Sequence, residues 1–258
     1  MRTTRLISSF LVLPALFALP QSQEMRADVR DPDSARQLAP PAPLSDEARA
    51  DVLMARKMYR EAIELYLSIK PPTAVIFNKV GIAYHQSGNL DDAKKYYDRA
   101  LKLNRNYAEA LNNAGTVHYA RKSYRRAVST YKKALKLSPN SASIHSNLGT
   151  AYFARKDYKR AIEEYEIALQ LDPEVFEHRS TQGVLLQERT VEERAKFHYY
   201  LAKAYAKAGR HELALQYIRK ALEEGFKDRR RFLEENEFEG LRKLPEFDQL
   251  MKLEPRVL

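Results

Sequence analysis

Histidines and carboxylates are the residues of this chain that could support acid–base or metal chemistry, but their spacing favours neither. The chain has six histidines and no cysteine, so disulfides and thiolate metal sites are excluded. No two histidines stand four residues apart beside a carboxylate, the spacing that places two zinc ligands on one helix face. The GxSxG, GxxxxGKS/T and HExxH motifs are also absent. We therefore interpret the protein as non-catalytic, with no cofactor and no metal site.

Basic residues gather in one part of the chain, which has a net charge of +10. Between residues 108 and 141, seven basic residues are opposed by Glu109 alone, so the local charge is +6. We call these seven the basic patch: Arg121, Lys122, Arg125, Arg126, Lys132, Lys133 and Lys136. Such a patch can dock anionic lipid headgroups, acidic proteins or nucleic acid. Alternatively, it is a solvated face that only favours solubility.

Residues 142–175 predict the elements that position these side chains. His145 is followed by Leu148, Gly149 and Tyr152 at spacings of three, four and seven, which is typical of one helix face. Because glycine has no side chain, Gly149 lets a second backbone approach closely. The segment therefore predicts a first helix that crosses its neighbour tightly.

A second helix follows in the same segment. Asp157 is a suitable N-cap, because its carboxylate can accept from the free N–H groups of a first helical turn. Ala161, Tyr165 and Ala168 form its inner stripe, whereas Glu163, Glu164 and Glu166 fit a solvated face. Pro173 stands after the last turn, where its missing N–H stops continuation.

The order of small and aromatic residues recurs with a period of 34 residues. Copies begin at residues 74 and 108, and another begins at residue 195. The small position of the first helix in these copies and in residues 142–175 is occupied by Gly81, Gly115, Gly149 and Ala202. Residues 44–73 form a degenerate opening copy, with Ala50 and Ala62 at the small positions and Tyr66 at the aromatic one. His118, His145 and His198 fall on the inner stripes, where we expect their rings to pack as polar-edged aromatics.

This pattern resembles the tetratricopeptide repeat family, whose period is 34 residues and whose signature positions are these. The resemblance covers residues 44–225 and implies an all-α solenoid of about five helix pairs. First helices would line a concave groove, and second helices would form the outer wall, whereas the alternative is a generic helical bundle. The repeats are expected near residues 44–73, 74–107, 108–141, 142–175 and 195–225.

The resemblance also implies which residues face the groove, namely the fifth, ninth and twelfth of each first helix. These are Asn78, Ile82, His85, Asn112, Thr116, Tyr119, Ser146, Thr150, Phe153, Tyr199, Lys203 and Ala206. Asn113 and Asn147 stand at the next position, like an asparagine ladder in some members. An amide both donates and accepts, so a row of amides could hold a peptide backbone, with Tyr119 and Phe153 as apolar footholds. Alternatively, the asparagines only fit the helix interface.

The front of the chain is typical of an exported protein. Residues 1–22 carry Arg2 and Arg5 before an apolar run, as a secretory signal does, although an uncleaved anchor is the alternative. The run is too short for a comfortable membrane span. Residues 23–43 are polar and rich in proline, which predicts a disordered linker. We expect a periplasmic or secreted protein of the bacterial envelope, and export disfavours nucleic acid as a partner.

Residues 176–194 interrupt the repeats as an inserted loop. Thr190 and Glu193 predict a capping box, so a helix should begin near Val191. Within the loop, Val184-Leu185-Leu186 is apolar. Our hypothesis is that the loop folds over the groove or pairs with a second chain. The alternative is that the Val184-Leu185-Leu186 triplet fills an apolar gap between the last two repeats.

Residues 226–258 predict a C-terminal cap that covers the open face of the last repeat, with Pro245 in the first turn of its closing helix. Together these features favour an exported scaffold that binds a protein or peptide in its groove. The alternative is a membrane-associated structural or assembly factor. Such a factor would use the basic patch and the inserted loop for tethering or self-association.

Overall fold

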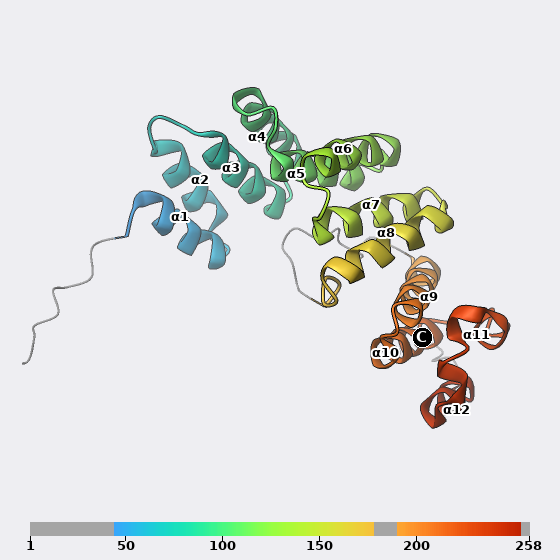
Figure 1. Cartoon of the computed structure of the whole chain (residues 1–258). Helices are drawn as coiled ribbons and strands as arrows, with labels where there is room; N and C mark the ends of the chain where they lie inside the picture. The colour runs from blue at the N-terminus through green and yellow to red at the C-terminus, as the bar shows by residue number, and fades with distance from the viewer. Residues whose placement is uncertain (1–43, 178–189, 254–258) are drawn as a thin grey trace, which may run out of the picture. The chain divides into compact units, whose positions relative to one another are not determined.

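The computed structural model describes residues 44–177 and 190–253 (Figure 1). The predicted signal of residues 1–22, the predicted linker of residues 23–43 and the apolar run Val184-Leu185-Leu186 lie outside the described residues, as does His178. Among the helices of the described stretches, none is both long enough and apolar enough to cross a membrane.

Ten helices follow one another as five packed pairs within these residues (Figure 1). The pairs are α1 (Asp46–Ala55) with α2 (Tyr59–Ser68), α3 (Ala74–Gln86) with α4 (Leu90–Leu103), α5 (Ala108–Ala120) with α6 (Tyr124–Leu137), α7 (Ala142–Ala154) with α8 (Tyr158–Leu171), and α9 (Val191–Lys207) with α10 (His211–Glu223). Each second helix also packs on the first helix of the next pair. The described residues contain no strand, and the predicted all-α solenoid of about five helix pairs is confirmed.

Helix starts follow the signals in the sequence. The side chain of Asp157 accepts from the N–H of Arg160 and caps α8. Thr190 and Glu193 form the predicted capping box at the start of α9, and both of its hydrogen bonds are 3.2 Å long. Pro245 is the first residue of the closing helix. These three predictions are confirmed.

The turn inside each pair contains one residue with a left-handed backbone. Gly88 and Gly209 supply it in the second and fifth pairs, with φ of 84° and 71°. Lys57, Lys122 and Lys156 supply it in the other three pairs, with φ between 56° and 61°. Because a side chain makes this conformation unfavourable by about 1 kcal/mol, the packing of the flanking helices must hold these lysine turns in place.

The three glycines of the repeat pattern lie directly under tyrosine rings. A Cβ on Gly81, Gly115 or Gly149 would stand 2.5 Å from a ring carbon of the tyrosine sixteen residues later, which is closer than such atoms approach. The rings concerned are those of Tyr97, Tyr131 and Tyr165. The predicted tight crossing is therefore confirmed for the second, third and fourth pairs. In the fifth pair, Ala202 and Ile218 take the two positions, and both are fully buried.

The C-terminal segment closes the last pair, as predicted. It consists of α11 (Arg230–Glu234), η1 (Asn236–Phe238), η2 (Leu241–Lys243) and α12 (Pro245–Met251). Its apolar residues Phe232, Phe238, Leu241, Phe247 and Leu250 are buried. In this segment, η1 packs on α9 and α12 packs on α10.

The start of the inserted loop packs between the last two pairs. The ring of Phe176 lies edge-on to Tyr165 at 5.3 Å and to Tyr205 at 6.2 Å between centroids. Glu177 accepts from the hydroxyls of Tyr205 (3.4 Å) and Tyr217 (3.0 Å). These two residues therefore help to fill the gap between α8 and α9.

Candidate binding face on the first helices

The predicted groove residues all belong to the first helices α3, α5, α7 and α9. Among these helices, α5 packs against both α3 and α7. We call the side that carries these residues, together with the matching side of α1, the first-helix face. The contacts between successive first helices decide which of its side chains are used inside the molecule and which remain for a partner.

The asparagines pair with one another between successive first helices. Asn113 donates from Nδ2 to Oδ1 of Asn78 at 3.0 Å, and Asn147 donates to Oδ1 of Asn112, also at 3.0 Å. The four side chains are only 2–5 % exposed. We call the places where α3 meets α5 and where α5 meets α7 the amide junctions. At both, the asparagines fit the helix interface, which was the alternative role that the sequence left open.

A second hydrogen bond repeats within the pairs. The hydroxyls of Tyr131 and Tyr165 donate to Thr116 Oγ1 (3.3 Å) and Thr150 Oγ1 (3.4 Å), each fifteen residues earlier. In the second pair the residue fifteen before Tyr97 is Ile82, which offers no acceptor. The buried hydroxyl of Tyr97 consequently lacks a hydrogen-bond partner in the described structure, and burial raises its pKa.

Several residues of the first-helix face keep part of their surface exposed. They are Ile82, His85, Tyr119, Ser146 and Lys203. Burial lowers the pKa of His85, which favours its neutral form. Tyr119 rests against Tyr124, with 5.2 Å between ring centroids. Apart from Lys203, which pairs with acidic residues of the C-terminal segment, these half-buried side chains are the part of the predicted set that a partner could touch.

Phe153 does not offer the open foothold that its position suggested. It is 4 % exposed, because it packs edge-on against Phe197 at 5.4 Å and against Tyr158 at 5.5 Å. Thr116, Thr150 and Ala206 are also buried.

The C-terminal cap contacts the part of the first-helix face that α9 contributes. Lys203 Nζ lies 2.9 Å from Glu235 and 3.2 Å from Glu237. The buried Tyr199 donates its hydroxyl to Glu235 as well, and its ring stacks on Phe226 at 4.5 Å. Of the predicted groove residues of α9, Tyr199 and Lys203 therefore hold the cap in place.

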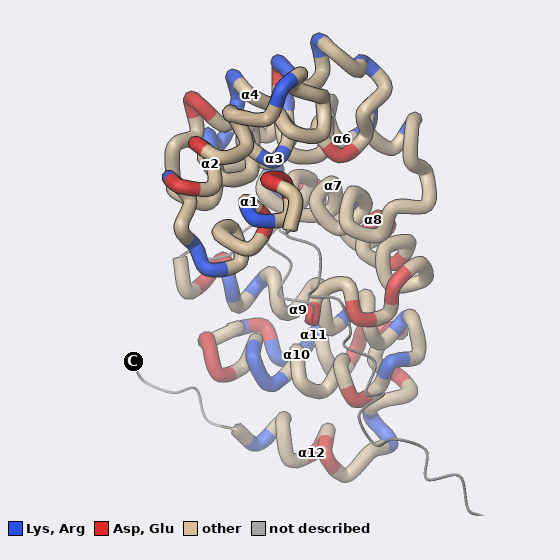
Figure 2. The backbone as a smooth tube through the Cα atoms, turned by 90° about the vertical axis from the view of Figure 1, so that its left-hand side faces the viewer, with Lys and Arg blue, Asp and Glu red and all other residues tan. Residues whose placement is uncertain are grey.

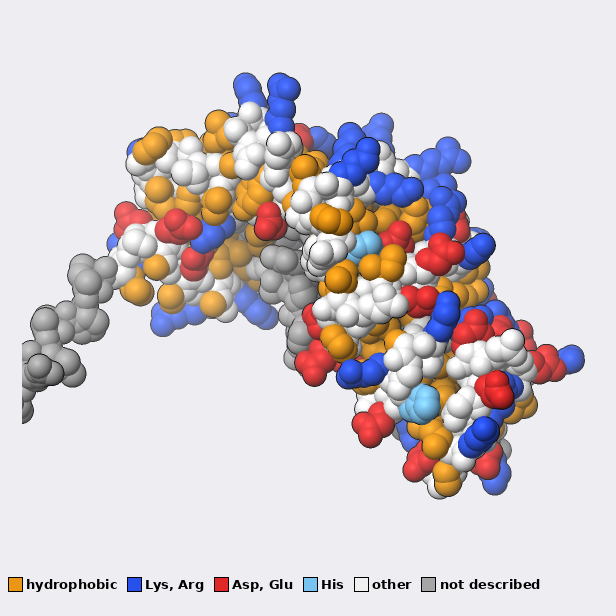
Figure 3. All heavy atoms as spheres, in the orientation of Figure 1, with side chains coloured by type: hydrophobic (Ala, Val, Ile, Leu, Met, Phe, Trp, Pro, Cys, Tyr) orange, Lys and Arg blue, Asp and Glu red, His pale blue; other side chains and the backbone are white. Residues whose placement is uncertain are grey.

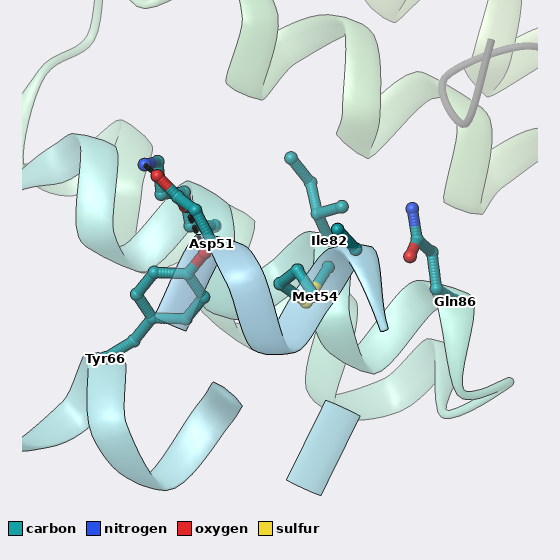
Figure 4. Close-up of a pocket in the computed structure, with 7 residues that line it drawn as sticks. Asp51, Met54, Tyr66, Ile82 and Gln86 are labelled. Atoms are coloured by element: carbon teal, nitrogen blue, oxygen red, sulfur yellow. Dashed lines mark hydrogen bonds and ion pairs between the residues drawn. The ribbon is translucent and has the colours of Figure 1, made fainter. Parts of the chain in front are cut away.

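Where α1 and α2 meet α3, which we call the first junction, the first-helix face is hollowed. A cavity of about 290 Å³ is lined by Asp51, Met54, Ala55, Tyr66, Lys79, Ile82 and Gln86 (Figure 4). We call it the first-junction pocket. Of these seven residues, only Ile82 was predicted from the sequence as a groove residue. Asp51 and Met54 follow the small residue Ala50 by one and four residues, the same offsets at which Ile82 and His85 follow Gly81, so alignment on the small position identifies them.

Lys79 is held between two carboxylates at the first junction. Its Nζ lies 2.7 Å from Asp51 Oδ2 and 2.7 Å from Glu47 Oε1. Burial lowers the pKa of Lys79, but the hydrogen bonds to these two carboxylates outweigh it, so the net shift is upward. Tyr66 donates its hydroxyl to Asp51, and burial raises its pKa. The lysine is thus charged and the tyrosine neutral, which leaves one net negative charge.

The seven residues of the basic patch are all exposed. Arg121 pairs with Asp91. Within the described part of the chain, the five basic residues of α6 (Arg125, Arg126, Lys132, Lys133 and Lys136) form no ion pair, and α6 contains no acidic residue. Figure 2 shows Lys and Arg positions in blue along α4 and α6. Figure 3, in the orientation of Figure 1, shows blue Lys and Arg side chains projecting from the part of the surface where these two helices lie.

His145 is buried, as expected for a ring on an inner stripe. Its Nδ1 lies 2.7 Å from Glu164 Oε2, and its Nε2 lies 2.9 Å from the carbonyl oxygen of Pro139. Since a carboxylate and a carbonyl only accept, both ring nitrogens can bond only if both carry a proton. The hydrogen bond to Glu164 raises the pKa of His145 accordingly.

In residues 44–177 and 190–253, no three His, Cys, Asp or Glu residues are grouped in a way that could hold a metal ion.

Models of the tetratricopeptide repeat match residues 73–140 and, in a second match, residues 114–175 and 184–228. An uncharacterized protein named ycf37 from Pyropia yezoensis is 32 % identical over 83 residues, which are 28 % of this chain. The chain spans about half the length of this relative, 47 %.

Solved structures also resemble the chain. One is MamA, residues 41 to the end, from Desulfovibrio magneticus RS-1, with 21 % identity, a TM-score of 0.47 and coverage of 72 % of this chain and 99 % of that one. Another crystal structure of MamA has 22 % identity, a TM-score of 0.47 and coverage of 69 % and 95 %. The first TPR of Spaghetti (RPAP3), bound to an HSP90 peptide, has 24 % identity, a TM-score of 0.40 and coverage of 42 % and 86 %.

Proposed function

This chain belongs to the tetratricopeptide repeat family, and on that premise we propose that it is a non-catalytic scaffold that binds a protein or peptide along its first-helix face. The observation that supports this most is the pairing of Asn78 with Asn113 and of Asn112 with Asn147. These bonds tie three successive first helices together. A surface that is ordered before binding loses less entropy on association, so it suits an extended partner.

In this proposal the asparagines and the partner have separate roles. The buried amides set the spacing of the helices, and the partner contacts the half-buried residues Ile82, His85, Tyr119 and Ser146. Tyr119 supplies an aromatic surface for apolar contact. Ser146 donates its hydroxyl to the carbonyl of Ser143 and keeps lone pairs for a partner's N–H groups.

A site-specific crosslinking experiment tests this proposal. The photoreactive residue p-benzoylphenylalanine replaces Tyr119 or Ser146 on the first-helix face, or, as a matched control, the exposed Lys95 or Lys159 on second helices. The full chain is then irradiated in its native cells. We expect one common partner to be crosslinked from both first-helix positions and from neither control. A partner crosslinked only from Lys95 and Lys159 would contradict the proposal.

We also propose that the protein is exported to the periplasm or the cell exterior. This rests on Arg2 and Arg5 before the apolar run. Mass spectrometry of the protein purified from each cell fraction should find a chain cleaved near residue 22, or an uncleaved chain attached to the membrane. An intact chain found only in the cytosol would exclude export.

The basic patch supports a second candidate function, the docking of an anionic membrane surface for tethering. The unpaired cations of α6 carry this proposal. Co-sedimentation with vesicles that contain phosphatidylglycerol should fall with added salt and be lost in the Arg125→Glu, Arg126→Glu double variant. Substituting Lys95 and Arg99 of α4 in the same way serves as the control.

A further inference from the structure

The first-junction pocket combines an acidic end with apolar walls. Figure 4 shows Met54 and Ile82 near the centre, Asp51 and Tyr66 at one end, and Gln86 at the other. Its volume of about 290 Å³ lies at the lower limit for pockets that enclose whole small molecules, which begin at about 300 Å³. The pocket therefore suits a single long side chain better than a complete ligand.

The acidic end has unused capacity to accept hydrogen bonds. Asp51 already accepts from Lys79 and from the Tyr66 hydroxyl, but about half of its side chain, 48 %, is exposed. Glu47, on the other side of Lys79, is 44 % exposed. With two carboxylates and one ammonium, this end carries one net negative charge. A further cation would balance that charge and bond the remaining lone pairs.

The apolar walls suit the stem of the same side chain. Met54 from α1 and Ile82 from α3 line the cavity, and the partly buried Met54 packs against the apolar core cluster of the first pairs. Long basic side chains bury their methylene groups along apolar surface and keep the charged end in a polar environment. The thioether of Met54 adapts its shape easily to such a stem.

We infer that the first-junction pocket receives a basic side chain of the partner, with its methylene groups between Met54 and Ile82 and its charged end at Asp51. The inference rests on the proposed function, because it places a protein segment along the first-helix face. It adds to that function the chemistry of one anchoring residue, arginine or lysine. Arginine fits best, since its planar guanidinium can bond a carboxylate through two N–H groups.

Methyl NMR of the full chain tests the inference without knowledge of the partner. The protein has five methionines, of which Met54 lines the pocket and Met251 lies in α12. The chain is labelled with ¹³C-methyl methionine and titrated with N-acetyl-Gly-Arg-Gly-amide, and with the same peptide carrying leucine or glutamate. We expect the Met54 signal alone to shift saturably with the arginine peptide, with a Kd on the order of 1 mM.

Two variants separate charge from shape. Asp51→Asn keeps the shape of the pocket but removes its carboxylate, and it should weaken the arginine peptide about tenfold. Ala55→Leu adds bulk at an exposed lining position and should abolish binding while leaving the charges intact. Equal shifts with the leucine peptide, no shift of Met54, or unchanged binding by either variant would overturn the inference. None of these results alters crosslinking from Tyr119 and Ser146, so the proposed function stands or fails separately.

Discussion

The first junction and the two amide junctions use similar backbones for different purposes. At the amide junctions the inner polar residues are buried and bonded to one another, as in Asn78 with Asn113. At the first junction the inner polar residues are half exposed and charged, and they surround a cavity. The comparison shows that the side chains at a few inner positions decide whether a junction serves the stack or remains available to a partner.

The two kinds of junction should also differ in what they contribute to stability. A buried amide that loses its partner destabilises the fold by about 1–3 kcal/mol, because its desolvation is no longer offset. A half-exposed ion pair contributes roughly 0–1 kcal/mol, because water competes for both charges. We therefore expect the amide junctions to be sensitive in unfolding experiments and the first junction to be sensitive in binding experiments.

The largest expected effect comes from the backbone crossing beside the amide junctions. Gly115→Ala places a methyl group 2.5 Å from the ring of the fully buried Tyr131. We expect a loss of about 1–3 kcal/mol in the free energy of unfolding by urea, as for other overpacked cores. The first pair already accommodates a methyl group at Ala50. Wild-type stability of Gly115→Ala would show that the second helix can move aside.

Removal of one amide tests the comparison directly. Asn113→Ala leaves Oδ1 of the buried Asn78 without its donor and should lower unfolding stability by about 1–3 kcal/mol. Asp51→Asn at the first junction should lower it by less than about 1 kcal/mol. In a double-mutant cycle, Asn78→Ala with Asn113→Ala should be less damaging than the sum of the two. Strict additivity would mean that the 3.0 Å bond contributes nothing.

A matched pair of tyrosines gives a smaller effect. Tyr131→Phe removes the bond to Thr116 and should lower stability by about 0.5–1.5 kcal/mol. Tyr97→Phe removes a buried hydroxyl that has no partner, so stability should be unchanged or slightly higher. Urea denaturation of the two variants in parallel provides the measurement, and the opposite order would refute the assignment of these hydroxyls.

The effect of pH should be the most modest. The raised pKa of His145 means that the folded state holds its proton more tightly than the unfolded state. Its stabilisation should be complete below about pH 6.5, the unfolded value, and disappear as pH rises through the folded value. None of the residues that line the first-junction pocket is a histidine, so the pocket lining should not contribute to this change.

The measurement for His145 must be a difference. Burial lowers the pKa of His85, His118 and His198, and these residues contribute with the opposite sign. Thermal melting of wild type and His145→Gln should therefore be compared between pH 5.5 and 8.5. We expect the gap between the two to narrow as pH rises, and a constant gap would contradict a protonated His145.

Local signals in the sequence predicted most of the architecture. Gly115, the cap residue Asp157 and the capping box at Thr190 act within one helix pair, so residue type and spacing suffice to place them. The left-handed turn at Lys122 gave no such signal, because lysine does not normally favour that backbone. The turn exists because the helices on both sides hold it.

The helices that carry the candidate residues were predicted, but the contacts of these residues were not. Asn112 and Asn147 were placed correctly on the first helices, yet their pairing depends on the offset between successive helices, which residue spacing does not specify. The engagement of Lys203 by Glu235 depends on the C-terminal segment, 32 residues away. Asp51 was missed because the opening repeat was treated only as a degenerate end.

The contact between glycine and the tyrosine ring has a consequence for how such a chain can be rearranged. Duplicating or exchanging a whole helix pair keeps each glycine opposite the tyrosine ring that leaves no room for a Cβ. A hybrid that joined α9 to α4, α6 or α8 would instead set the methyl group of Ala202 against a tyrosine ring that packs directly on a glycine in its own pair, because α9 is matched to Ile218. The helix pair, rather than the single helix, is therefore the smallest piece of this protein that can be transplanted without redesign.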